Sequence, residues 1–127
     1  MTALPPESAH TEFLDRFRAR DLDGVVALYT DDASFVGFDG AVVTGKAAVR
    51  AAFEALFAQI GPNCTIELTT RYAVPNGDIA LLSNTWHIGG TAADGSPLDL
   101  GGQTTEVVRR QADGRWLYVI DHPLGGQ

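Results

Sequence analysis

The chain has 127 residues, of which 45% are hydrophobic and 20% are charged. This length suits one domain and this composition is typical of a chain that folds around an apolar core, so we expect a single domain over residues 1–127 and exclude a disordered chain. Nine basic and 16 acidic residues give a net charge of −7. That charge repels nucleic-acid phosphates and anionic membrane surfaces, and it argues against both as partners.

Cysteine, histidine and the N-terminal residues exclude further classes of protein. Cys64 is alone in the sequence, and the first residues lack a basic and apolar leader pattern, so we expect a reduced, cytoplasmic protein. His10, His87 and His122 lie far apart, without the close spacing that is typical of metal ligands. No glycine-rich phosphate loop occurs, and we expect neither a metal nor a cofactor.

The first part of the chain predicts two helices. Pro5 and Pro6 precede apolar residues at helical spacing, which predicts a helix over residues 7–19. Asp21 can then cap a second, short helix. The predicted apolar face of this second helix consists of Leu22, Val25, Val26 and Tyr29.

A short hairpin and a third helix follow. Ser34 to Val36 predict an extended segment that turns at Asp39 and Gly40. From Lys46 the apolar residues again recur at helical spacing. We expect this helix to end at residues 61–62, Gly-Pro, through a left-handed cap.

The remainder of the chain alternates apolar and polar residues with period two, as strands do. Turn sequences with Asn-Gly or Asp-Gly at residues 75–78, 93–95 and 112–114 separate four predicted strands and predict antiparallel hairpins. The pattern indicates an α+β fold with three N-terminal helices on one face of a strongly curved, mainly antiparallel sheet. The residues expected in its core are Phe13, Phe17, Val26, Phe53, Leu56 and Phe57.

Three strings in this order resemble the nuclear transport factor 2-like superfamily, and within it the small SnoaL-like and ketosteroid-isomerase-like proteins. They are DLDGVVALYTDDA at residues 21–33, DGAVVTGK at residues 39–46 and EVVRRQADGRW at residues 106–116. The resemblance implies a cone-shaped barrel with a pocket between the helices and the sheet. It also implies a small apolar or polyketide-like ligand, although this fold hosts both enzymes and non-catalytic binding modules.

The resemblance to the isomerases covers only part of their catalytic machinery. Gly37 stands at the position of the carboxylate base, and Phe13 stands where the isomerases have the tyrosine that binds the oxyanion. Glu106 keeps the carboxyl group of the second oxyanion donor, Tyr29 keeps one supporting tyrosine, and Phe53 replaces the other. Steroid isomerisation needs both the base and the donor pair, so we do not expect that reaction.

Strand alternation and the resemblance together predict the pocket lining. If Glu106 points inward, Thr104 and Val108 share its face, and the resemblance places Val119 and Asp121 inward on the last strand. A shift of one residue would exchange the two faces of each strand. With Phe13 and Phe53, the predicted lining comprises Phe17, Phe35, Phe57, Leu81, Ser83, Thr85 and His87.

Two functional hypotheses remain. In the first, Glu106, His87 and Asp121 move protons on a small cyclic or oxygenated molecule that Tyr29 orients, as in isomerases, cyclases or dehydratases. In the second, these groups form a structural network in a non-catalytic module that binds a ligand or another protein through the same cone, or that serves dimerisation. A cavity of roughly 300 Å³ or more would favour a ligand, and a filled cone would favour the module.

The opposite sheet face is predicted to join two copies of the chain. Its apolar residues would otherwise be exposed as a large patch, which favours a homodimer. The residues predicted on this outer face are Leu82, Trp86, Ile88, Trp116, Tyr118 and Ile120.

Overall fold

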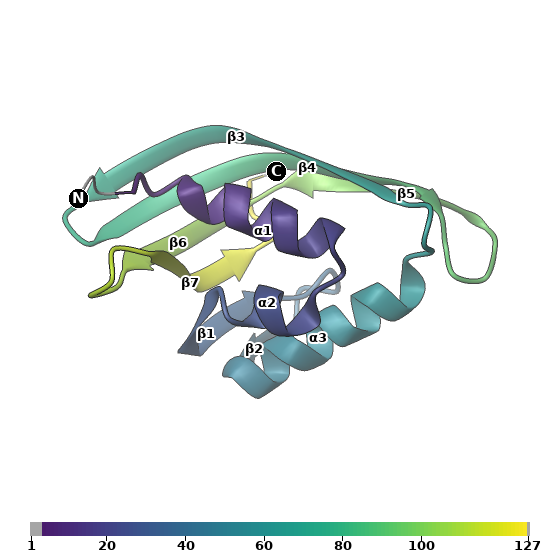
Figure 1. Cartoon of the computed structure of the whole chain (residues 1–127), viewed down its shortest axis with the longest axis horizontal. Helices are drawn as coiled ribbons and strands as arrows, with labels where there is room; N and C mark the ends of the chain where they lie inside the picture. Colours follow the sequence, from purple (N-terminus) through teal and green to yellow (C-terminus); the bar gives the residue numbers. More distant parts are fainter. Residues whose placement is uncertain (1–3, 127) are drawn as a thin grey trace.

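The computed structural model describes residues 4–126, and Figure 1 shows their arrangement. The helices are α1 (Ser8–Arg18), α2 (Leu22–Val26) and α3 (Lys46–Gln59). The strands are β1 (Tyr29–Val36), β2 (Val42–Thr44), β3 (Thr65–Asn76), β4 (Ile79–Thr91), β5 (Pro97–Gln103), β6 (Thr105–Arg110) and β7 (Trp116–His122).

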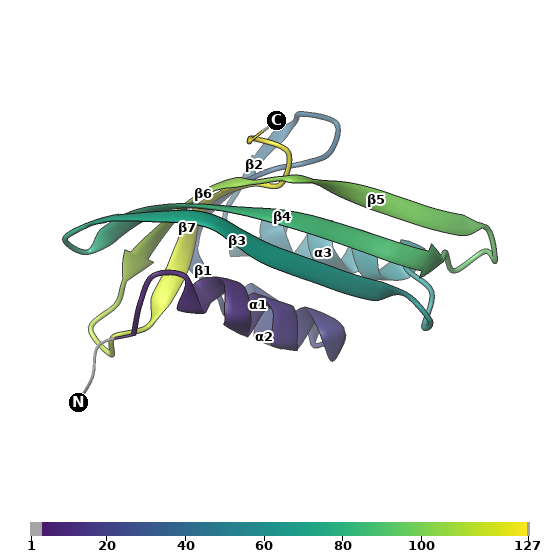
Figure 2. The same ribbon diagram turned by 90° about the horizontal axis from the view of Figure 1, so that it is seen from above.

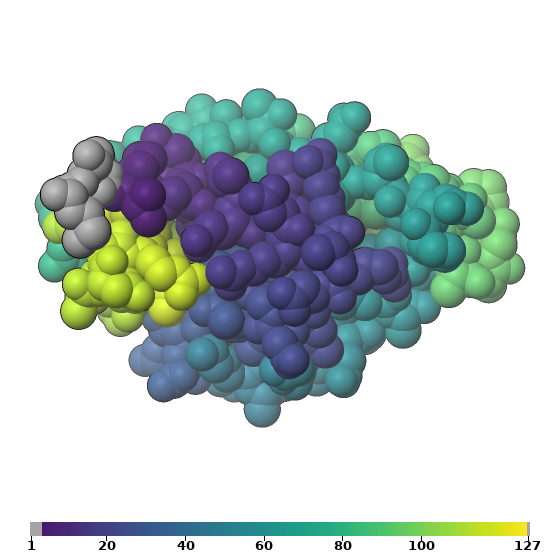
Figure 3. Space-filling model, in the orientation of Figure 1, coloured from purple at the N-terminus to yellow at the C-terminus, as the bar shows by residue number. Residues whose placement is uncertain are grey.

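All seven strands form one sheet in the order β2-β1-β7-β6-β4-β3, and β5 pairs with β4. The pair β1 and β7 is parallel, and the other pairs are antiparallel. The helices lie on one side of the curled sheet (Figure 2), and the side chains of α1 and α2 cover its middle (Figure 3). The predicted α+β fold, with three helices packed on a curved and mainly antiparallel sheet, is therefore confirmed.

The sheet changes partners in the middle of β4. The first part of β4 pairs with β6 up to Leu82, and the second part pairs with β5 from Thr85 onward. Between them, the Asn84 N–H donates to Thr104 Oγ1 and the Thr104 N–H donates to the Asn84 carbonyl, both at 2.9 Å. The single strand expected between the turns at residues 93–95 and 112–114 is thus two strands, β5 and β6. The polar side chain of Thr104 lies at the break between them, beside the middle of β4.

The local predictions hold for the helices except at two points. Asp21 caps α2 by accepting the N–H of Gly24 at 2.9 Å. Tyr29 begins β1 and is not part of the second helix, because the helix ends at Val26. The left-handed cap after α3 is also wrong, since Ile60 is extended with φ −83° and ψ 124°.

The three predicted glycine turns of the sheet are present. Gly77, Gly95 and Gly114 have φ values of 64°, 90° and 87°, which a residue with a Cβ adopts only with strain. Their positions set where β4, β5 and β7 begin and so fix the lengths of the hairpins.

The predicted faces of the sheet are reversed on β4 and on part of β7. Leu82, Trp86 and Ile88 are at most 8% exposed and belong to the core, as do Trp116 and Tyr118. Of the residues predicted on the outer face, only Ile120 is exposed, at 44%. The period of two residues identifies the two faces of a strand but not which of them the helices cover, so a shift of one residue inverted the prediction.

A different apolar row lies on the outer face. Val74 pairs with Leu81, Leu81 pairs with Val107, and Val107 pairs with Ile120, so the row crosses four strands. Val74, Leu81 and Ile120 are 55%, 39% and 44% exposed.

Candidate functional site

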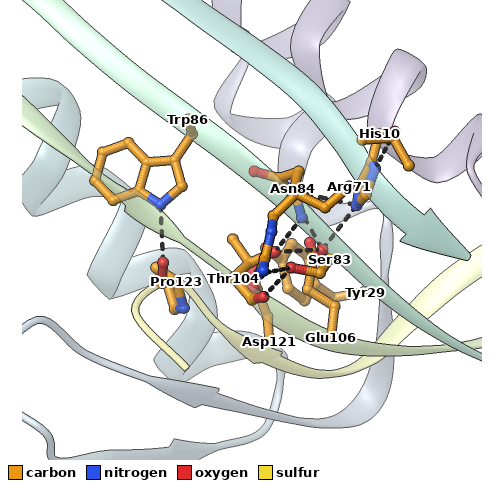
Figure 4. A network of polar contacts seen from close by, with 11 residues as sticks. His10, Tyr29, Arg71, Ser83, Asn84, Trp86, Thr104, Glu106, Asp121 and Pro123 are labelled. Carbon is orange, nitrogen blue, oxygen red and sulfur yellow. Dashed lines mark hydrogen bonds and ion pairs between the residues drawn. The ribbon is translucent and has the colours of Figure 1, made fainter. Parts of the chain in front are cut away.

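Two carboxyl groups lie side by side inside the sheet (Figure 4). Glu106 on β6 and Asp121 on β7 are directly paired across the two strands. Glu106 is only 3% exposed and Asp121 only 6%. Burial removes the hydration that stabilises a carboxylate, and two carboxylates at adjacent positions repel each other. Both effects favour the neutral form of at least one of the two acids.

Helix α1 supplies a histidine to this pair. His10 is 2% exposed, and its Nε2 lies 2.7 Å from Glu106 Oε1. Its Nδ1 lies 2.8 Å from Thr70 Oγ1 on β3. If Nε2 carries a proton, it donates to Glu106, so the two side chains hold each other in place inside the core.

Two neighbouring side chains also donate to Glu106, and the buried side chain of Tyr118 lies beside it. Thr104 Oγ1 donates to Glu106 Oε1 at 2.8 Å, and Asn84 Nδ2 donates to the same oxygen at 3.3 Å. Asn84 Oδ1 is buried and has no hydrogen-bond partner among residues 4–126. Since buried polar atoms are normally satisfied, this oxygen is a candidate acceptor for water or for a ligand donor.

Asp121 is bound on its other side by a tyrosine. The Tyr29 hydroxyl donates to Asp121 Oδ2 at 2.5 Å. Burial, and then the nearby charge of Glu106, raise the pKa of Asp121 to about 8, although the bond from Tyr29 opposes the shift. Burial, followed by the charge of Asp121, raises the pKa of Tyr29 well above its ordinary value. The shift favours the protonated form of Asp121, which can donate a proton or a hydrogen bond.

A β-bulge brings Asp121 to this position. Val107 pairs with Ile120 but Val108 pairs with Tyr118, so Val119 is the extra residue on β7. An extra residue shifts the side-chain alternation by one. As a result both Tyr118 and Asp121 are buried, at 1% and 6% exposed, although they are three positions apart.

An apolar cavity of about 60 Å³ adjoins the polar groups. Asn84, Thr104, Glu106 and Asp121 form its polar part. Its apolar part consists of Phe13, Phe17, Phe35, Phe38, Phe53, Leu56, Ile66, Leu68, Trp86, Ile88 and Pro123. The aromatic rings therefore fill most of the cone, and the space left is far below the roughly 300 Å³ typical of a formed ligand pocket.

One of the aromatic rings that line the cavity is exposed. Phe38, in the turn between β1 and β2, lines the cavity and is 49% exposed. It stacks on Trp86 with the ring centroids 5.7 Å apart, and Trp86 Nε1 donates to the Pro123 carbonyl at 2.8 Å. Phe38 is the ring that could move most easily to enlarge the space, because it is the least buried of them.

The structure separates the predicted site residues into two groups. Tyr29, Glu106 and Asp121 lie together, and Phe13, Phe17, Phe35, Phe53 and Thr104 line the cavity. His87 does not lie there: its side chain is 50% exposed and its Nε2 contacts Asp99 Oδ1 at 2.6 Å. The reversed face of β4 explains this error.

The remaining residues of the predicted lining also lie outside the cavity. Leu81 and Thr85 are exposed, and Ser83 is buried but donates to the Thr104 carbonyl. Val108 is fully buried in the core, Val119 is the bulge residue, and Phe57 lines a different groove.

Sequence reasoning missed His10 and Asn84. His10 precedes Phe13 and Phe17 by three and seven positions, so it lies on the apolar face of its helix. Asn84 alternates with Leu82 and Trp86 in the same way on its strand. In both cases a polar residue at an apolar position was the available signal.

Residues 4–126 contain neither a candidate metal site nor a helix that could span a membrane. Histidine, cysteine and acidic side chains form no group of three that could hold a metal ion there. No helix in this part of the chain is long and apolar enough to span a bilayer.

Comparisons with known proteins agree with this architecture. The family model of the SnoaL-like domain matches residues 10–119. No curated protein matches the sequence.

Solved structures resemble the fold over most of its length. A conserved protein from Planctomyces limnophilus is 24% identical, with a TM-score of 0.81 over 93% of this chain and 91% of that one. A ketosteroid isomerase-like protein from Erwinia carotovora atroseptica is 21% identical, with a TM-score of 0.79 over 92% and 90%. A candidate dehydratase of the nuclear transport factor 2-like family from Streptomyces avermitilis is 21% identical, with a TM-score of 0.73 over 91% and 88%. At these identities the likeness shows the fold alone.

Proposed function

Because the chain belongs to the SnoaL-like domain family, we propose that its cone binds a small apolar molecule with a carbonyl or hydroxyl oxygen and transfers a proton to it. The observation that carries the proposal is the buried pair of Glu106 and Asp121 beside the cavity. A polar network that served only packing would not need two adjacent acids, since burying each of them costs stability.

The two acids have different surroundings, and this assigns them different roles. Asp121, with its pKa raised to about 8, is the proton donor to a ligand oxygen. Glu106 accepts hydrogen bonds from Thr104 and Asn84 and lies 2.7 Å from His10 Nε2, an arrangement that suits a proton acceptor. In enolisation of a ketone, Asp121 would protonate the carbonyl oxygen while Glu106 removes the proton from the adjacent carbon.

The size of the cavity limits the ligand. A space of about 60 Å³ admits only a compound of a few heavy atoms unless Phe38 moves away from Trp86. We therefore propose a small single-ring compound, with Asn84 Oδ1 as the acceptor for any donor group on it.

Deuterium exchange of cyclopentanone tests proton transfer directly. In D₂O, the protein should speed exchange of the protons next to the carbonyl above the buffer rate. Asp121→Asn should remove at least about 99% of this acceleration, because general acid catalysis typically contributes 10²–10⁴-fold. The control Asp31→Asn removes a carboxylate that is 98% exposed and should leave the rate unchanged. Exchange at the buffer rate with the unmodified protein would refute proton transfer.

The small cavity also supports the second candidate, a module that binds another protein. The side chains that fill the cone make it resemble a packed core more than an open pocket. In that case Glu106, Asp121 and His10 are structural, and neither cyclopentanone nor phenol should bind. Saturation-transfer NMR with both compounds distinguishes the two candidates, since the module predicts no signal.

A further inference from the structure

A second hollow, larger than the cavity, opens on the surface of the protein. It is a groove of about 450 Å³ between the C-terminal ends of α1 and α3 and the start of β3, which converge in Figure 1. Phe17, Phe57 and Ile66 form much of its apolar wall. None of the residues bound to Glu106 or Asp121 lines this groove, although Phe17, Ile66 and Ile88 form a wall that it shares with the cavity.

The groove carries a local positive charge in an acidic protein. Arg18, Arg20 and Glu67 are the charged residues that line it, which gives it a charge of +1. Within residues 4–126, neither arginine lies within 4.0 Å of a carboxylate oxygen. By contrast, Arg50 and Arg110 elsewhere on the surface are paired with aspartates.

Backbone carbonyls hold both guanidinium groups at the groove. Arg18 Nη2 donates to the Ile66 carbonyl at 3.1 Å. Arg20 Nη2 donates to the Phe57 carbonyl at 2.6 Å, and its guanidinium lies 5.5 Å from the centre of the Phe57 ring. A guanidinium has five N–H donors, so these bonds position the groups and leave donors for an anion.

The backbone at Arg20 also favours a role for its side chain. Arg20 has φ 54° and is the only non-glycine residue with positive φ among those described. It follows the end of α1, where its N–H donates to the Phe17 carbonyl, and glycine is the usual residue at such a position. An arginine there carries backbone strain that a glycine would avoid.

We propose that this groove binds a small apolar molecule with one carboxylate group. The apolar body lies against Phe17, Phe57 and Ile66, and the carboxylate is bound by Arg18 and Arg20. A single negative charge matches the charge of +1 in the groove, whereas a dianion would be opposed by Glu67 and by the net charge of −7. This site goes beyond the proposed proton transfer and does not depend on it.

NMR titration of the full chain with 4-phenylbutyrate and 4-phenylbutanol tests the proposal, because the two probes differ mainly in charge. Amide signals of Cys64, Thr65 and Ile66 should shift with both probes. The carboxylate should bind about fivefold more tightly than the alcohol, the gain expected from partly exposed charged hydrogen bonds. Arg18→Gln should reduce this preference to less than about twofold.

A matched control separates the groove from general electrostatics. Arg109→Gln removes the same charge from an exposed position on β6, outside the groove, and should leave the preference unchanged. Equal binding of both probes, an equal effect of the two variants, or no shift of groove amides would each overturn the proposal. Asp121→Asn should have no effect on binding of 4-phenylbutyrate, so failure of proton transfer and failure of the groove site are distinguishable.

Discussion

The raised pKa of Asp121 predicts an unusual dependence of stability on pH. The ordinary pKa of this group is 3.8, and in the folded protein it is about 8. Between these values the unfolded chain has lost the proton while the folded protein keeps it. The folded state therefore binds more protons, and the free energy of unfolding falls as the pH rises through this window.

The size of the effect follows from the same shift. One bound proton changes the free energy of unfolding by about 1.4 kcal/mol per pH unit. Over the whole window, from pKa 3.8 to about 8, the free energy of unfolding falls by about 6 kcal/mol because of Asp121. Asp121→Asn cannot ionise and keeps an acceptor for the Tyr29 hydroxyl, so it should remove this contribution without removing the bond.

Urea unfolding of the wild type and of Asp121→Asn at several pH values is the assay. The difference in unfolding free energy, wild type minus variant, should fall by about 1.4 kcal/mol per unit from about pH 5 to about pH 7. The exposed variant Asp31→Asn lacks the burial that causes the effect and serves as the control. A difference between wild type and Asp121→Asn that does not change with pH would refute the protonated buried acid.

Three more predictions concern His10, Phe38 and the apolar row on the outer face of the sheet. His10→Ala should lower the free energy of unfolding by about 3 kcal/mol or more, because it leaves Glu106 buried without its partner. In urea unfolding, the double variant with Glu106→Gln should lose less than the sum of the losses of the two single variants. Additive losses would contradict the pairing. Phe38→Ala should lower the free energy of unfolding by no more than about 1 kcal/mol, because this ring is 49% exposed. The same variant should bind cyclopentanone more tightly in NMR titrations. Unchanged binding would show that Phe38 does not restrict the cavity. The exposed apolar row on the outer face of the sheet, which includes Leu81 and Ile120, predicts a homodimer. Leu81→Lys should dissociate this dimer. A wild-type mass near 13.5 kDa in sedimentation, the mass of one chain, would exclude it.

The sequence by itself predicted the three helices and the glycine turns in their order, but not the division of one expected strand into β5 and β6. Helical spacing from Lys46 predicted α3, which runs over Lys46–Gln59, and the glycine turns predicted the hairpins. These signals are local: a helix buries one stripe, and a tight turn needs a residue that tolerates positive φ. No knowledge of distant contacts was required to find them.

Only the tertiary structure decided which face of β4 and of the first part of β7 the helices cover. His10 contacts Glu106 across 96 positions of sequence, a contact that no local pattern indicates. The alternation on β4 was visible, but both choices of face satisfy it, so the sequence placed His87 inside and Trp86 outside, the reverse of the structure. On β7 the bulge at Val119 changes the alternation within the strand. A period of two residues carries no information about either effect, because both depend on packing between segments that are distant in the sequence.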